Sequence, residues 1–458
     1  RTCADTDGSG LAFSSGLCVA AGMLRRSDWT SAPACAGGCE TADCCVVSGS
    51  DVGALTNLVS NTDATEIERF EVSPDGKHLY AALGDDDSIA YWDRDAVSGA
   101  LSNMRVVKDS TNLNDIQGLT VSPNGKHVYA TSYEAGSMVY FDRDADTGVL
   151  SNQRNINDLL QLFHVTVSPD GKNVYASSYS GFIVYWNRDT DTGELTNLVK
   201  IDDTINLNGA VHIEVSPDGK NVYVAAWRYD TLVYFNRDTS TGALTNQVSL
   251  IDSADRDSTQ CVIVSPNGKH VYASGATSNS IVSYDRDADT GALTKTNVLK
   301  DDTNLDPRHI TMSPDGKTIY AIGYSTKTLN YWTRDPDTGI LSNQVNLNDG
   351  NTNINALWCV AVSPDGKNVY TGSRSPNTLV YWDRSSVDSC STFSCIAGYS
   401  VSNTNTICAT VGCDADDCTC SANSCTSTLV QNSDKAFTNA VAGTTGESIT
   451  VTCDTNYH

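Results

Sequence analysis

The sequence is poor in basic residues and has no long hydrophobic run. Its 30 Lys and Arg residues face 55 Asp and Glu residues, which gives a formal net charge of −25 at pH 7. Because so acidic a chain is repelled by polyanions, we expect neither nucleic acid nor an anionic membrane surface as a partner. No apolar stretch reaches the roughly 20 residues of a membrane-spanning helix, so we expect no membrane insertion. The Asn-x-Ser/Thr acceptor sequence for N-linked sugar is missing as well.

A short signature, Val-Ser-Pro-Asp/Asn-Gly-Lys, recurs through the middle of the chain. Successive copies are 46 to 50 residues apart. A period in this range indicates one supersecondary unit per repeat. The first residue of each copy is Val72, Val121, Val167, Val215, Val264, Met312 or Val362.

Each repeat has the pattern of four short strands. In the fourth repeat, the alternating run 210–215 ends at Ser-Pro-Asp-Gly, whose Pro and Gly suit a tight hairpin turn. Strand-like segments follow at 221–226, 231–235 and 243–248. Four period-2 strands repeated seven times predict an all-β fold, a seven-bladed β-propeller.

The two ends of the repeat array predict how the ring closes. The seventh repeat stops after Arg384 and lacks the Gly-x-Leu-Thr-Asn segment that forms the fourth strand elsewhere. That segment occurs instead before the first repeat, at 53–57. We therefore expect residues 53–60 to complete the last blade and to leave no open sheet edge, in a propeller that spans 50–386.

Fourteen of the sixteen cysteines lie at the two ends of the chain, in the segments 1–49 and 387–458. Even counts of six and eight predict small disulfide-rich modules of an extracellular protein, the second continuing beyond the last residue. Zinc is the alternative, but the Cys and His spacing of zinc sites is missing. The short Cys-Ile-Ala-Gly-Tyr segment at 395–399 resembles turns of EGF-like and sushi modules. The cysteines expected in disulfides are Cys3, Cys18, Cys35, Cys39, Cys44, Cys45, Cys390, Cys395, Cys408, Cys413, Cys418, Cys420, Cys425 and Cys453.

The repeat motifs resemble those of a known family. Ser-Pro-Asp-Gly-Lys-x-x-Tyr, followed by Tyr-Trp-x-Arg-Asp-x-x-Thr-Gly-x-Leu-Thr, is similar to the seven-bladed lactonase family, which includes 6-phosphogluconolactonase and muconate-lactonising enzymes. The segment Asp306-Pro-Arg-His-Ile310 also resembles that family's Pro-Arg-His segment near the channel mouth. The resemblance implies the propeller fold. These are turn and strand signatures, and they carry little information about chemistry.

The innermost strands supply the candidate catalytic residues. The positions three residues before each repeat valine are Arg69, Gly118, His164, His212, Cys261, His309 and Cys359. If the protein is an enzyme, we expect acid/base or metal chemistry at His164, His212, Glu214, Arg308 and His309. No nucleophile, base and orienting group can be read from this mixed ring, so the sequence favours no catalysis. Cys261 and Cys359 belong to non-adjacent blades and are not expected to pair.

The acidic turn at 142–148 resembles the start of a calcium loop, but its Gly is one place late and the required Glu is missing. Related turns place neutral residues at the ligand positions, which turn capping tolerates and metal binding does not. We therefore predict capping, and expect neither metal nor cofactor.

The loops that join the fourth strand of one repeat to the first strand of the next lie on the face opposite these acidic turns. They bring acidic residues beside aromatic rings. This pattern suits glycan or protein recognition. Packing of the rings between blades is the alternative. The predicted binding face comprises Tyr133, Tyr179, Trp227, Tyr324, Asp202, Asp203, Asp301 and Asp302.

Two classes of function remain open. The sequence favours a non-catalytic extracellular structural or adhesive protein, in which the propeller contacts other protein subunits or glycans and could repeat as a homopolymer in a surface filament. This interpretation explains the cysteine-rich ends and the mixed channel ring. The alternative is a secreted lactonase-like hydrolase that acts on a small lactone in the channel.

Overall fold

The structure is a computed structural model of the 458-residue chain. It describes residues 24–25, 45–46, 55–61, 66–348, 354, 356–374, 377–384, 399–401 and 420–422. The chain divides into two units, one comprising 53–385 and the other 1–52 together with 386–458. In the second unit two short antiparallel pairs are described, β1 (Leu24–Arg25) with β2 (Cys45–Val46) and β31 (Tyr399–Val401) with β32 (Cys420–Ala422).

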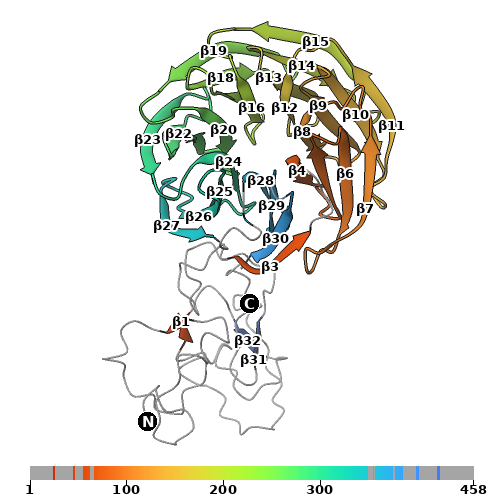
Figure 1. Cartoon of the computed structure of the whole chain (residues 1–458). Helices are drawn as coiled ribbons and strands as arrows, with labels where there is room; N and C mark the ends of the chain where they lie inside the picture. The colour runs from red at the N-terminus through yellow and green to blue at the C-terminus, as the bar shows by residue number, and fades with distance from the viewer. Residues whose placement is uncertain are drawn as a thin grey trace, which may run out of the picture. The chain divides into compact units, whose positions relative to one another are not determined.

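The unit 53–385 is a seven-bladed β-propeller, and each blade is a four-stranded antiparallel sheet (Figure 1). An all-β propeller was predicted from the repeats, and the structure confirms it. From the channel outwards, blade 1 comprises β4 (Ile67–Val72), β5 (His78–Leu83), β6 (Ser88–Arg94) and β7 (Leu101–Lys108), and blade 2 comprises β8 (Ile116–Val121), β9 (His127–Ser132), β10 (Ser137–Arg143) and β11 (Leu150–Ile156). Blade 3 comprises β12 (Leu162–Val167), β13 (Asn173–Ser178), β14 (Phe182–Arg188) and β15 (Leu195–Asp202), and blade 4 comprises β16 (Ala210–Val215), β17 (Asn221–Ala226), β18 (Thr231–Arg237) and β19 (Leu244–Ile251). Blade 5 comprises β20 (Thr259–Val264), β21 (His270–Gly275), β22 (Ser280–Arg286) and β23 (Leu293–Lys300), and blade 6 comprises β24 (Pro307–Met312), β25 (Thr318–Gly323), β26 (Thr328–Arg334) and β27 (Leu341–Leu347). Blade 7 comprises β28 (Leu357–Val362), β29 (Asn368–Ser373), β30 (Leu379–Arg384) and β3 (Leu55–Asn61).

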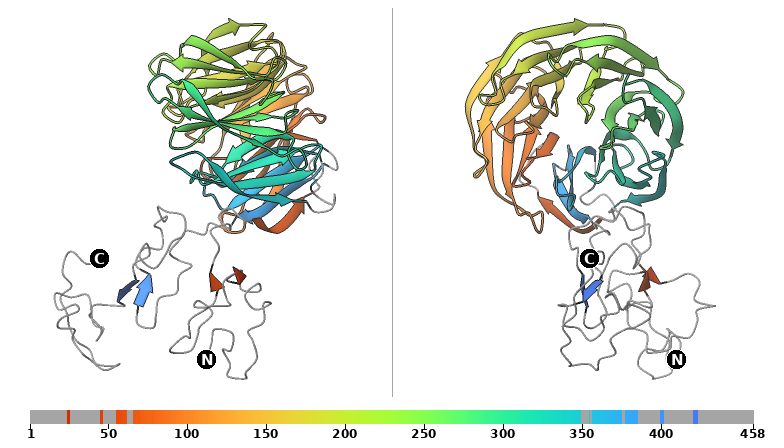
Figure 2. Two further views of the ribbon diagram at one scale, coloured as in Figure 1. Left: turned by 90° about the vertical axis from the view of Figure 1, so that its left-hand side faces the viewer. Right: turned by 180° about the vertical axis from the view of Figure 1, so that it is seen from behind.

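Blade 7 is built from both ends of the propeller sequence. Strand β3 pairs antiparallel with β30, with Leu55 opposite Arg384 and Val59 opposite Tyr381. This is the place expected for the displaced Gly-x-Leu-Thr-Asn segment. The early strand lies at the outer edge of the blade that contains the late ones (Figure 2). The chain ends of the propeller are therefore joined by a hydrogen-bonded ladder.

The hydrophobic core lies between neighbouring blades. Tyr80 and Ile89 of blade 1, for example, pack with Leu119, Val128 and Phe141 of blade 2 in one buried cluster. Because each blade has two faces and neither alone encloses a core, stability depends on stacking successive blades around the ring.

An arginine at the end of each blade's third strand binds the preceding blade. In blade 1, Arg94 donates through Nε to Tyr370 Oη at 2.8 Å and through Nη2 to both Asp365 oxygens at 3.1 Å. Its Nη1 donates to the Gly76 carbonyl of its own blade at 2.8 Å. The Asp belongs to the repeated Ser-Pro-Asp-Gly turn of blade 7, so the signature also links blades. We call Arg94 and its equivalents the clasp arginines. The others are Arg143, Arg188, Arg237, Arg286, Arg334 and Arg384.

The acidic turns between the third and fourth strands are capped by their own carboxylates. Asp144 Oδ1 accepts from the backbone N–H of Asp146 at 3.1 Å and of Thr147 at 2.8 Å. Asp142, the first residue of the calcium-like segment, instead binds Arg154 and Asn152. The carboxylates of this turn are therefore occupied by donors of the chain itself, as expected for turn capping.

The predicted disulfide modules lie outside the described residues. This applies to Cys3, Cys18, Cys35, Cys39, Cys44, Cys390, Cys395, Cys408, Cys413, Cys418, Cys425 and Cys453, and to the side chains of Cys45 and Cys420. Within the propeller, Cys261 and Cys359 are free and buried. No helix in the described part of the chain has the length and apolar character needed to span a membrane.

Candidate functional site

The innermost strand of each blade carries a register irregularity near its start. In blade 6, Pro307 pairs with Gly323 and His309 pairs with Ile322, so Arg308 is the extra residue. A bulge of this kind re-aims side chains, because the extra residue breaks the strict alternation of a strand. Arg308 and His309 consequently both line cavities of the channel, although they are neighbours in sequence.

One cavity, here called the mouth cavity, opens at the end of the channel where the innermost strands begin. Its volume is about 440 Å³. It is lined by residues of blades 2 to 7 with contrasting chemistry, aromatic on one side and cationic on the other. They are Asp115, Gln117, Tyr133, Phe163, Tyr179, Val211, Trp227, Ser258, Gln260, Thr277, Arg308, Trp358 and Arg374.

The aromatic wall is a chain of touching rings from blades 2 to 4. Tyr133 meets Tyr179 edge to face at a centroid distance of 5.7 Å, and Phe163 stacks on Tyr179 at 6.4 Å. Trp227 extends the chain, 5.9 Å from Tyr179. Arg228 covers its outer end, with its guanidinium carbon 4.9 Å from the centre of the Tyr179 ring. Rings packed in this way are held in fixed orientations and present a rigid apolar surface.

The cationic wall comes from blades 6 and 7. The Arg374 guanidinium lies 3.5 Å from the centre of the Trp358 ring. Arg308 lies 5.9 Å from the same ring and 5.5 Å from that of Tyr324. The Nε of Arg308 makes no hydrogen bond with any described residue, although it lies 3.5 Å from Asp306 Oδ1. Arg308 therefore has donor capacity left for a ligand in the cavity.

Among the carboxyl groups near these arginines, Asp115 and Glu68 differ in environment. Asp115 lines the mouth cavity and accepts from Gln117 Nε2 at 2.5 Å. Glu68 is buried and forms an ion pair with Arg374. Burial raises the pKa of Glu68 to about 7, although Arg374 acts in the opposite direction. The charge of Arg374 is thus partly balanced within the protein, whereas Asp115 faces the cavity.

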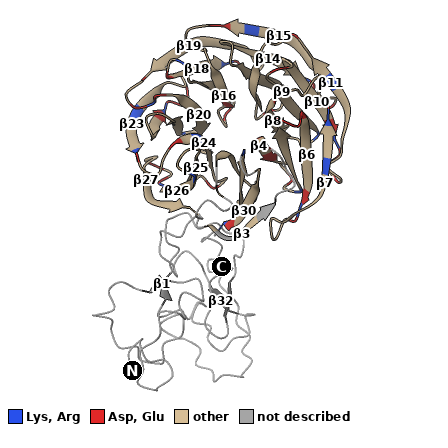
Figure 3. Ribbon diagram, viewed as in Figure 1, with Lys and Arg blue, Asp and Glu red and all other residues tan. Residues whose placement is uncertain are grey.

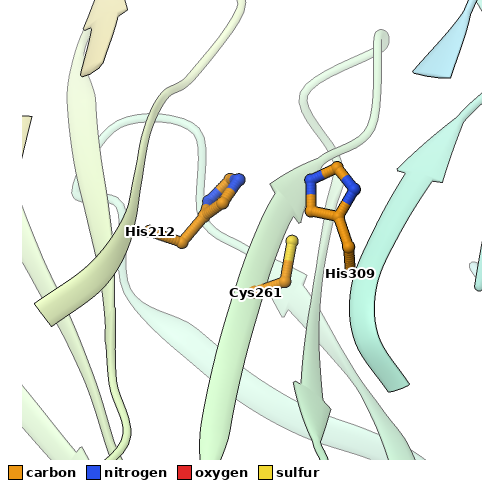
Figure 4. A group of neighbouring side chains, drawn as sticks. All are labelled: His212, Cys261 and His309. Carbon is orange, nitrogen blue, oxygen red and sulfur yellow. The ribbon is translucent and has the colours of Figure 1, made fainter. Parts of the chain in front are cut away.

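Histidines and a thiol form the next layer of the channel, adjacent to the mouth cavity. The rings of His164 and His212 stack at 4.1 Å, and His309 follows at 5.7 Å from His212. A nitrogen of His212, the Cys261 sulfur and a nitrogen of His309 lie within 4.8 Å of one another, and all three side chains are buried (Figure 4). Burial lowers the pKa of each of the three histidines well below its usual value, so the rings are neutral at pH 7.

The hydrogen bonds of this layer do not suit a metal ion. His309 Nδ1 accepts from the Val360 backbone N–H at 3.2 Å, so a neutral ring carries its proton on Nε2. Figure 4 shows the other ring nitrogen of His309 on the side of Cys261. Metal-bound imidazole needs the opposite arrangement, in which the second nitrogen donates a hydrogen bond. The arrangement offers an N–H donor to the channel in place of a ligand lone pair.

A second cavity, here called the vestibule, lies at the Ser-Pro-Asp-Gly end of the channel. It also measures about 440 Å³ and is bordered by Arg69 and the three histidines of this layer. Glu71 and Glu214 line it from the inner strands β4 and β16, where Figure 3 marks acidic residues. Burial raises the pKa of Glu71 to about 7 and that of Glu214 to about 8.

The structure distributes the sequence-derived candidates over both cavities. Of the five residues expected for an enzyme, Arg308 lines the mouth cavity, whereas His164, His212, Glu214 and His309 line the vestibule. Three of the four predicted aromatic rings line the mouth cavity, and Tyr324 packs against its Trp358.

The predicted acidic residues of the binding face line neither cavity. Asp203 and Asp301 cap their own loops, where each accepts from a backbone N–H three residues later. Asp202 pairs with Lys200 at 2.7 Å, and Asp302 is exposed.

Sequence reasoning missed Asp115, Phe163, Trp358 and Arg374. Phe163 and Trp358 occupy the same bulge position as Arg308 in their own blades. This common place, four residues before the repeat valine, is the signal that could have identified them.

Comparison with known proteins agrees with the repeat architecture. A family model described as "Lactonase, 7-bladed beta-propeller" matches residues 51–161, 107–205, 161–262, 246–354 and 307–397. No curated protein matches the chain.

Similar solved structures share the fold. A Bacteroides fragilis protein assigned as a 6-phosphogluconolactonase is 22% identical with a TM-score of 0.55, over 63% of this chain and 86% of that one. The periplasmic gluconolactonase PpgL of Pseudomonas aeruginosa is 17% identical with a TM-score of 0.52, over 60% and 83%. Hydrazine synthase of Kuenenia stuttgartiensis is 19% identical with a TM-score of 0.55, over 72% and 98%. At these identities the likeness concerns the fold alone.

Proposed function

The chain belongs to the lactonase family of seven-bladed β-propellers, and from this premise we propose that it hydrolyses a small sugar lactone bound in the mouth cavity. The observation that carries the proposal is one cavity whose lining combines an aromatic wall, Arg308 with an Nε that lacks a hydrogen-bond partner among the described residues, and the carboxyl group of Asp115. A propeller fold alone would not suffice, because it supports many unrelated functions.

The walls suit a sugar ring. Its apolar C–H face packs against Tyr179 and Trp227, and its hydroxyls reach Gln117, Gln260 and Ser258, which also line the cavity. The volume of about 440 Å³ accommodates a monosaccharide-sized ligand. The arginines of the cationic wall favour a carbonyl oxygen or an acidic substituent on that side.

Each group has a role in ring opening. Arg308 donates to the lactone carbonyl oxygen and stabilises the negative charge that develops there. Asp115 takes a proton from the attacking water, whose oxygen bonds to the carbonyl carbon. The ring C–O bond then breaks, the leaving alkoxide takes the proton held by Asp115, and the hydroxy acid is released. Glu68 is a positioning residue, because it acts by holding Arg374 against the cavity.

The non-catalytic interpretation favoured by the sequence has less support. That interpretation depended on the channel residues three positions before each repeat valine, among which no nucleophile, base and orienting group could be recognised. The candidate site, however, lies one layer nearer the mouth of the channel. The family match also favours the hydrolase. Binding of a glycan without turnover is the outcome that would restore the adhesive role.

We further propose an extracellular location for the hydrolase. The acidic composition and the clustered cysteines at both chain ends support it. Peptide mapping of secreted protein without and with reduction tests the disulfides on which this proposal depends.

The catalytic proposal predicts a separation of kinetic effects among variants. In an assay against γ- and δ-aldonolactones, Asp115→Asn should lower kcat by about 100-fold with little change in KM, because it removes the general base. Trp227→Ala should mainly raise KM, because it removes part of the sugar-binding wall. Arg154→Gln is the control, since Arg154 lies on the outer strand β11, where Figure 3 marks basic residues. No turnover above the uncatalysed rate for any lactone would overturn the proposal.

A further inference from the structure

Arg69 is a partly buried arginine, and two of its donor atoms are buried without a hydrogen-bond partner among the described residues. It lies on the innermost strand β4 and borders the vestibule. Its Nε and Nη1 atoms are buried and have no hydrogen-bond partner among the described residues. The clasp arginine Arg94, by contrast, has partners for Nε, Nη1 and Nη2. Buried donors without partners are costly, so an anion that enters the vestibule and meets this partly buried guanidinium gains a strong interaction there.

The acids nearest Arg69 in sequence are engaged elsewhere. Glu68 is paired with Arg374. Glu71 Oε2 accepts from the Val121 backbone N–H at 3.3 Å. Neither carboxylate forms a hydrogen bond with Nε or Nη1 of Arg69, so the described residues do not satisfy this guanidinium, which borders the vestibule.

Neutral histidines add donors beside this charge. His309 carries its proton on Nε2, because Nδ1 accepts from Val360. His212 is 4% exposed, borders the vestibule, and has a buried Nδ1 without a partner in the described structure. Arg69 and these imidazoles therefore form a roof rich in N–H donors, the arrangement that recognises a carboxylate.

The other lining groups limit the kind of anion. Glu71 and Glu214 line the same cavity, together with the hydroxyls of Thr166 and Thr311. With pKa values of about 7 and 8, these carboxyl groups exchange hydrogen bonds with sugar hydroxyls, and the ionised fraction disfavours a dianion such as phosphate more than a monoanion. A ligand with one carboxylate and several hydroxyls satisfies both ends.

We propose that the vestibule is a second binding site, which holds a small hydroxy acid with its carboxylate on Arg69 and its hydroxyls on Glu71, Glu214 and the threonines. It shares no lining residue with the mouth cavity. The site therefore does not depend on catalysis at the mouth. Lactone hydrolysis releases a hydroxy acid. If the mouth cavity is catalytic, the vestibule would therefore bind the product of the reaction.

Gluconate is a suitable probe, and isothermal titration with inorganic phosphate as the comparison tests the site. The wild type should bind gluconate more tightly than phosphate, and Arg308→Gln, which disables the mouth cavity, should retain this binding. Arg69→Met should weaken it at least about tenfold, as expected for losing charge-assisted hydrogen bonds. Glu214→Ala should weaken it as well, through the hydroxyl end of the ligand.

The Arg69 variant also has a stability readout. Without gluconate, Arg69→Met should melt no lower than the wild type, because it removes buried donors that have no partner. With gluconate, only proteins that keep Arg69 should gain thermal stability. The proposal would be overturned if Arg69→Met bound gluconate as tightly as the wild type. It would also be overturned if Arg308→Gln were the only variant to lose gluconate binding. Loss of lactone turnover alone would bear on the mouth cavity and leave the vestibule site standing.

Discussion

The contact between blades 2 and 3 depends on a histidine that must stay neutral. His127 Nδ1 accepts from Nη2 of the clasp arginine Arg188 at 2.7 Å. Burial and the nearby charge of Arg188 lower the pKa of His127 to about 4, against the weaker opposite effect of Asp142. In the unfolded chain the pKa is about 6.5. Protonation would turn an acceptor into a donor beside a cation.

The sign of the pH effect follows from these two pKa values. Between pH 6.5 and 4 the unfolded chain binds a proton that the folded protein excludes, so stability is complete above pH 6.5 and is lost as pH falls. At about pH 4.5 the loss amounts to about 2.5 kcal/mol for this one residue. His78 and His270 accept from Arg143 and Arg334 in the same way and act in the same direction.

The repeats supply a matched substitution for His127. Blade 3 has Asn173 in the same place, and its Oδ1 accepts from the clasp arginine Arg237 at 2.6 Å. His127→Asn should therefore leave the urea midpoint unchanged near neutral pH and raise it relative to the wild type near pH 4.5. Equal acid sensitivity of the two proteins would refute the role of His127. A large loss of stability for His127→Asn at neutral pH would refute the equivalence of the two side chains.

Further predictions concern ring closure, the clasp and the buried thiols. Deleting residues 1–60 removes β3 and exposes the edge of blade 7, so the truncated propeller should melt clearly below the intact protein; equal melting would contradict closure by this strand. Arg94→Gln should destabilise the protein by about 3–5 kcal/mol, because it leaves the part-buried carboxylate of Asp365 uncompensated at the closing interface; denaturant titration measures this. Cys261 and Cys359, whose thiol pKa values are raised by burial, should resist iodoacetamide until the protein unfolds; rapid labelling of the native protein, located by peptide mapping, would contradict their burial.

The propeller was predictable because its signals are local. Ser-Pro-Asp-Gly specifies a hairpin turn within four residues, and alternating patterns specify the strands beside it. Even the unusual place of β3 follows from an interrupted repeat. Contacts between blades were not predictable in the same way. Arg94 and Tyr370 are 276 positions apart, and nothing local in either segment indicates that they meet.

The candidate site was predictable only in part. The alternation of the innermost strands identified His164, His212 and His309 as a channel layer. Arg308 was identified through its sequence motif, yet the bulge that turns it into the mouth cavity depends on pairing with β25. Arg374 directly follows the second strand of blade 7, and no other repeat has a charged residue at the corresponding position. Its role depends on its contacts with Trp358 and Glu68. These are properties of the assembled ring.

The central claim is that Arg308 stabilises charge on a lactone carbonyl in the mouth cavity. The most direct measurement is kcat/KM for aldonolactone opening by the wild type, Arg308→Gln and the outer-strand control Arg154→Gln. The wild type and the control should turn over alike, and Arg308→Gln should lose about 100-fold or more, as for removal of one oxyanion donor. Turnover that is unaffected by Arg308→Gln, or a wild type no faster than the uncatalysed reaction, would contradict the account.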